Sequence, residues 1–153
     1  MANLAESIED IVDAILGTLE DARQGAGLLV DEALKQVVRG SVTRGVPTPP
    51  ALWVVPRAAQ FSQDEYGLET WTMPVDIAAV VKSDDPDEGA AAANRLAALG
   101  LVIALTARPR ITVADIIDIV SQSFDPTAHS NEANKTLLWT YATLRATFTV
   151  TQP

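Results

Sequence analysis

The stretch LLWTYATLRATFTV, residues 137–150, decides the fold because its alternation predicts a long β-strand with two different faces. Trp139, Tyr141 and Arg145 lie on one face, and these residue types are enriched at interface hot spots. We expect that face to contact a neighbouring subunit or a partner, with a half-solvated sheet face as the alternative. The opposite face is mostly apolar and should close a core: Thr136, Leu138, Thr140, Ala142, Leu144, Ala146, Phe148 and Val150.

A helix that could cover the apolar face is predicted after the acidic stretch SDDPDEG, residues 83–89. Asp84 or Asp85 can cap it, and Pro86 suits its first position. The acids lack the ligand spacing of a calcium loop, so a helix start explains them better. The following residues, to about 107, are nearly apolar all round, which is typical of a buried helix lying across a sheet. Its expected buried side chains are Leu96, Leu99, Val102, Ile103 and Leu105.

Two helices are predicted near the N-terminus. Apolar residues recur at helical spacing from Leu4 to Leu19, and the glycines of RQGAG, residues 23–27, should break that helix. A second helix is predicted over residues 28–38, with Gly40 as its C-cap.

The sheet should contain two strands before the central helix and two after it. ALWVVP, residues 51–56, is the first, and residues 71–82 form the second, in which Pro74 indicates an edge or a bulge. Residues 112–125 fit either a helix or a strand, and we interpret them as a helical turn at 112–116 followed by a strand. A polar loop, residues 126–135, then leads into the final strand.

This order predicts an α+β domain with a mostly antiparallel sheet of about four strands, a buried helix packed across it and N-terminal helices. The length of 153 residues favours one domain, with a helical segment over 1–40 and an α+β core over 50–150.

Composition excludes several classes of function. The net charge of −9 comes without any Lys/Arg cluster, so a phosphate-gripping groove is not expected. The absence of cysteine excludes disulfides, thiolate metal sites and thiol catalysis. The longest apolar run is too short to span a bilayer, and the acidic start does not resemble a signal peptide. We therefore expect a protein made in the cytoplasm, with no membrane partner.

Candidate sites are few. His129 would have to carry any Ser–His–Asp relay, with Ser130 and Asp125, but no catalytic motif accompanies it, so an exposed loop histidine is the expectation. No catalytic, cofactor or metal site is predicted. The loop at 58–70 mixes apolar and acidic side chains, which is typical of a protein contact, although its aromatics could instead fold back on the sheet. Its candidate interface residues are Phe61, Asp64, Glu65, Tyr66 and Leu68.

From about Pro50 to Val150 the chain resembles the tail terminator proteins of long-tailed bacteriophages. The resemblance lies in the order of local patterns: PALWVVPRA, SQDEYGLETW, VDIAAVV, DPDEGA, and the pairing of IVSQSFDPTA with LLWTYATLRATFTV. Residues 1–40 depart from the smaller members of that family, because two helices are predicted where one is expected.

The resemblance implies a structural virion protein, without enzyme activity or cofactor. It implies a homo-hexameric ring that binds the last tail-tube ring, stops tube polymerisation and meets the head–tail connector, with the tail sheath as a further partner. Genomic DNA would pass through this acidic ring without specific binding. A head–tail connector or neck adaptor is the alternative in the same class. A small acidic enzyme or ligand-binding module, with loop 58–70 as a lid, is the alternative in another class.

Overall fold

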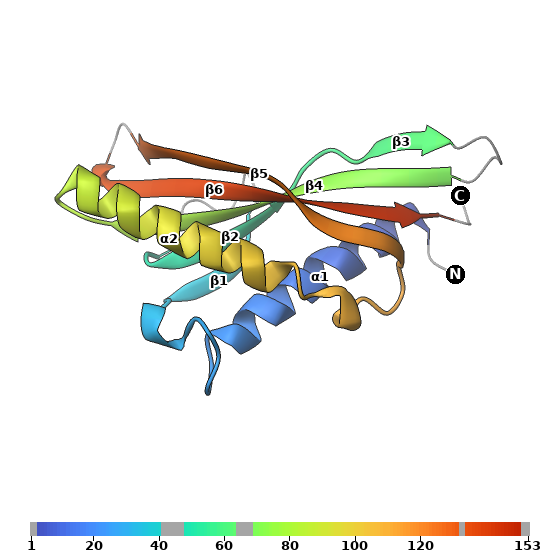
Figure 1. The fold of residues 1–153 in the computed structure, drawn as a ribbon, viewed down its shortest axis with the longest axis horizontal. Coiled ribbons are helices and arrows are strands. Elements are labelled where there is room, and N and C mark those ends of the chain that lie inside the picture. The colour runs from blue at the N-terminus through green and yellow to red at the C-terminus, as the bar shows by residue number, and fades with distance from the viewer. Residues whose placement is uncertain (1–2, 41–47, 64–68, 132–133, 151–153) are drawn as a thin grey trace.

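The computed structural model describes residues 3–40, 48–63, 69–131 and 134–150 and has an α+β fold (Figure 1). A single six-stranded sheet has the order β1-β2-β4-β6-β5, with β3 paired to β4 beyond the end of β2. Only the β1–β2 pair is parallel. The elements are α1 (Leu4–Ala22), a 3₁₀ turn η1 (Val30–Glu32), β1 (Gln36–Arg39), β2 (Ala51–Pro56), β3 (Gln60–Gln63), β4 (Glu69–Lys82), α2 (Pro86–Ala104), a 3₁₀ turn η2 (Arg108–Arg110), β5 (Asp115–Asn131) and β6 (Asn134–Thr149).

The predicted class and the mostly antiparallel sheet are confirmed, but the sheet has six strands and not about four. Both extra strands are short. β3 lies in the stretch predicted as the loop 58–70, where it pairs with residues 69–72 of β4. β1 lies in the stretch predicted as the second helix and pairs with β2.

Both helices cover the same face of the sheet, and the core lies between them and the strands. On β6 that face is the predicted one, since Leu138, Ala142, Leu144 and Phe148 are all buried. Gly89 allows the first turn of α2 to come close to this strand. A Cβ atom there would lie 2.3 Å from Leu138 Cδ1, so a side chain at Gly89 would force a displacement.

The start of α2 follows the sequence prediction, but its burial does not. Asp85 is the N-cap, and its side chain accepts hydrogen bonds from the backbone N–H groups of Asp87 (2.9 Å) and Glu88 (3.3 Å). Leu96 and Ile103 are buried, whereas Val102 is 61% exposed. Burial all round the helix was therefore a wrong prediction, because the sheet and α1 cover only one side of α2 and alanines occupy much of the other.

The second N-terminal helix was also a wrong prediction. The break after α1 is confirmed, with Gly25 at a φ of +58°. Only the short turn η1 follows, and Ala33 then adopts a left-handed backbone conformation. Val37 and Val38 pair with β2. β-Branched residues favour strands, and here that preference outweighs the helical pattern of the stretch.

The C-terminal hairpin is longer than predicted. β5 begins at Asp115 and continues to Asn131, so the polar stretch after residue 125 is strand and not loop up to that point. Four register shifts along β5 accommodate this length against β6. Pro74 lies on β4 between the residues that pair with β2 and those that pair with β3. Its carbonyl oxygen accepts a hydrogen bond from the backbone N–H of Arg57. Because no strand pairs with β4 on that side at this position, the missing N–H of the proline removes no hydrogen bond between strands.

One side-chain anchor fixes α1 to the loop before β5. Asp10 Oδ2 accepts hydrogen bonds from three consecutive backbone N–H groups, those of Thr112 (3.1 Å), Val113 (2.7 Å) and Ala114 (2.8 Å). An ion pair between Arg110 and Asp21 joins the same two segments. Together they join α1 to the segment just before β5.

Candidate interaction surfaces

The face of the sheet opposite the helices carries the three residues that the sequence singled out on β6. Trp139 and Tyr141 are half-buried, and Arg145 is exposed. The open face, as we call this side of the sheet, is polar near the middle of the strands. There Thr143 Oγ1 donates to Asp76 Oδ1 at 2.7 Å, and Arg57 forms an ion pair with Asp76 Oδ2 at 3.3 Å.

His129 belongs to the same face, which sequence reasoning missed. It lies on β5 opposite Trp139, and its ring stacks on Trp139 and on Tyr141 at centroid distances of 6.3 and 5.7 Å. The prediction of an exposed loop histidine was wrong because β5 extends six residues beyond Asp125. The alternation of Ala128 and Ser130 around His129 was too weak a signal to reveal the strand.

Asp125 is placed beside this aromatic cluster. Its Oδ2 lies 3.5 Å from His129 Nε2, a contact that becomes an ion pair when the histidine is protonated. The pKa of the Asp125 carboxyl is lowered, first by the hydrogen bond from the backbone N–H of Thr127 (2.9 Å), then by the Thr127 side chain and by His129. Asp125 therefore remains a carboxylate at neutral pH, next to two aromatic rings.

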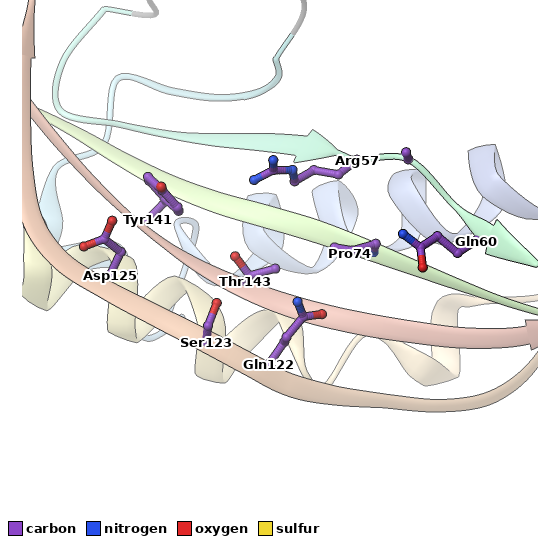
Figure 2. Close-up of a pocket in the computed structure, with 9 residues that line it drawn as sticks. Arg57, Gln60, Pro74, Gln122, Ser123, Asp125, Tyr141 and Thr143 are labelled. Atoms are coloured by element: carbon purple, nitrogen blue, oxygen red, sulfur yellow. The ribbon is translucent and has the colours of Figure 1, made fainter.

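A hollow of about 560 Å³ opens on this face (Figure 2). Figure 2 shows Arg57 and Gln60 from the segment after β2 across from Ser123 and Asp125 of β5. No sequence pattern indicated this hollow, because its lining residues come from four separate stretches that only the sheet register brings together. They are Arg57, Ala58, Gln60, Pro74, Gln122, Ser123, Asp125, Tyr141 and Thr143.

The predicted interface loop is described only in part. Phe61 lies on β3, where its ring packs against Trp71 of β4 at a centroid distance of 5.4 Å, and it is still 52% exposed. The other four candidate residues lie outside the described residues: Asp64, Glu65, Tyr66 and Leu68.

A second hollow, of about 580 Å³, lies on the helical side of the molecule and was not foreseen. Leu28 and Val102, which are 73% and 61% exposed, line it together with Leu99 and Ala98 of α2. An ion pair between Arg95 and Glu32 (2.9 Å) borders it. Its lining is mostly apolar because this side of α2 carries alanine, leucine and valine in place of polar residues.

Among the described residues, no group of three or more histidine or carboxylate side chains is arranged to hold a metal ion. Within the same residues, neither helix is long and apolar enough to cross a membrane. No protein-family model and no curated protein matches the chain.

Proposed function

We propose that the chain is a structural protein of a bacteriophage virion, a tail terminator whose copies form a six-membered ring on the end of the tail tube. One observation carries the proposal beside the sequence resemblance. The helices cover one face of a long sheet, and the other face keeps Trp139, Tyr141 and Arg145 accessible. Trp, Tyr and Arg are the residue types that contribute most to the binding energy of protein interfaces.

In this proposal the ring caps the last ring of tail-tube protein, ends polymerisation and presents its other side to the head–tail connector. The open face and the segment around Phe61 contact the adjacent subunit or the tube. The net charge of −9 suits a channel through which DNA slides without binding. A neck adaptor is the nearest alternative and differs only in its partner.

The first test is the mass of the purified chain. Light scattering after size-exclusion chromatography should give six times the 16.3 kDa subunit mass, alone or after addition of tail-tube protein. Electron micrographs should then show rings on tube ends and tubes that no longer elongate. A chain that stays monomeric and leaves tube growth unchanged would contradict the proposal.

A second function, the binding of a small polar ligand, is favoured by the hollow in Figure 2. Its lining offers Arg57 as a cationic donor, Tyr141 as an aromatic surface and Asp125 as an acceptor. That function needs only a monomer, so the same measurement of mass discriminates between the two.

A further inference from the structure

β3 and β5 form opposite edges of the sheet. Within the described residues, β3 pairs only with β4 and β5 pairs only with β6. In the right half of Figure 1 the order from top to bottom is β3, β4, β6 and β5. The outer backbone groups of both edge strands can therefore pair with a strand of another chain.

The two edges carry exposed apolar residues at the same level of the sheet. Phe61 of β3 is opposite Trp71, Trp71 is opposite Phe148, and Phe148 is opposite Ile116 of β5. Ile117, the extra residue at the register shift that follows, is 45% exposed, and Phe61 is 52% exposed. The row thus ends in the exposed Phe61 on one side and in the half-buried Ile116 on the other, where the exposed Ile117 follows directly.

The strand directions suit an addition of one copy to the next. β3 is antiparallel to β4, β4 to β6 and β6 to β5, so β3 and β5 run in opposite directions. A second copy placed beside the first, in the same orientation, brings its β3 antiparallel to β5. Antiparallel pairing is the more stable arrangement.

The distribution of charge also favours a contact between β3 and the first half of β5. Copies of a chain with a net charge of −9 repel each other, so a contact between them should use stretches with little charge. β3 (Gln60–Gln63) has no charged residue, and residues 116–124 of β5 contain only Asp118. The later part of β5 has Pro126 and a register shift between Asp125 and His129, features that hinder pairing at an edge.

We propose that β3 of one copy adds to the first half of β5 of the next and brings Phe61 against Ile117. Because the two surfaces differ, the contact is head-to-tail and can close into a ring. The inference rests on the proposed ring function and identifies the contact that would build the ring. It leaves Trp139 and Tyr141 on the open face for the tail tube.

Engineered disulfides test the contact directly, since the chain has no cysteine of its own. Three variants are needed: Phe61→Cys, Ile117→Cys and the chain with both changes. Within one chain the two positions are three strand spacings apart, roughly 14 Å, which is too far for a disulfide. After mild oxidation, the double variant should give a ladder of linked chains that ends at six, and each single variant should give none.

A matched control replaces the partner position with another exposed apolar residue of β5. Phe124 is 39% exposed but is paired with Ala142, at a different level of the sheet, so Phe61→Cys with Phe124→Cys should give no ladder. Circular dichroism verifies the fold of each variant. Light scattering provides a second test: Phe61→Lys should reduce the mass measured in solution to that of the monomer.

The other outcomes distinguish a failure of the β3–β5 contact from a failure of the proposed ring. A linked dimer from either single variant would indicate two-fold pairing and overturn the head-to-tail contact. A six-fold mass without a ladder would overturn the β3–β5 contact but not the ring. A monomer without a ladder, both alone and with tail-tube protein added, would overturn both. A ladder that continues past six would support the contact and contradict the six-membered ring.

Discussion

Asp10 Oδ2 accepts a hydrogen bond from the backbone N–H of Val113 at 2.7 Å, although 103 residues separate the two in the chain. The same oxygen accepts from Thr112 and Ala114, so one carboxylate satisfies the backbone donors of a whole turn. Asp10 lies between the apolar positions of α1, and helical periodicity alone does not reveal this role. The contact joins the first helix to the start of the C-terminal hairpin.

Asp10→Ala should lower the free energy of unfolding by about 2 kcal/mol, because hydrogen bonds to a charged group are lost and three N–H groups lose their acceptor. Chemical denaturation measures the change. Asp13→Ala, at an exposed position of the same helix, is the control and should change stability by no more than about 0.5 kcal/mol. Equal effects of the two substitutions would mean that the anchor contributes nothing.

Along α2, replacement of a side chain by alanine should lower the free energy of unfolding less when that side chain is more exposed. Leu96 is 3% exposed, and Leu96→Ala should lower stability by about 3 kcal/mol. Val102→Ala removes side-chain atoms that are mostly in solvent and should have an effect within about 0.5 kcal/mol. Leu99→Ala should fall between them, since Leu99 is half-buried. Thermal unfolding would contradict this order if Val102→Ala were the most damaging.

Replacement of Trp139 and Tyr141 by Asp should leave the subunit folded and prevent its docking on the tail tube. Both side chains lie on the open face, outside the core, and two added carboxylates beside Asp125 would repel an acidic or apolar partner. Circular dichroism reports the fold, light scattering should give the same mass as for the unaltered chain, and co-sedimentation with tail tubes reports docking. The matched control, Phe at both positions, should dock normally. Loss of the native circular dichroism in the Asp variant would instead assign these residues to folding.

The Asp125 carboxyl should titrate below its ordinary pKa of 3.8. Since the pKa is lowered by folding, the carboxylate stabilises the fold above pH 3.8, and this contribution is lost as the pH falls from 3.8 through the lower value. NMR titration of the Asp125 side chain gives the midpoint. His129→Gln should raise it only slightly, because the larger cause is the hydrogen bond from the backbone N–H of Thr127. An ordinary midpoint in the unaltered chain would contradict the described geometry.

The sequence predicted the elements whose patterns are strong and local. The start of α2 was predictable because Asp85 and Pro86 act within one turn, and the buried face of β6 was predictable from strict alternation. β1 was missed because Val37 and Val38 continue the helical spacing of Leu29, Ala33 and Leu34. The two valines can equally form a strand, and only the presence of β2 decides between the two structures. The hollow on the open face depends on the register between four segments, which no local pattern encodes.

The position of β6 bears on how the protein is made. β6 lies between β4 and β5, yet it is the last strand to be synthesised. On the ribosome, β4 and β5 therefore emerge before the strand that joins them, and the nascent chain holds two incomplete halves of a sheet. Until then the edge of β4 that pairs with β6, residues 70–82, has no strand beside it. Closure of the sheet therefore waits for β6, and a chain that lacks this strand is the form at greatest risk of aggregation.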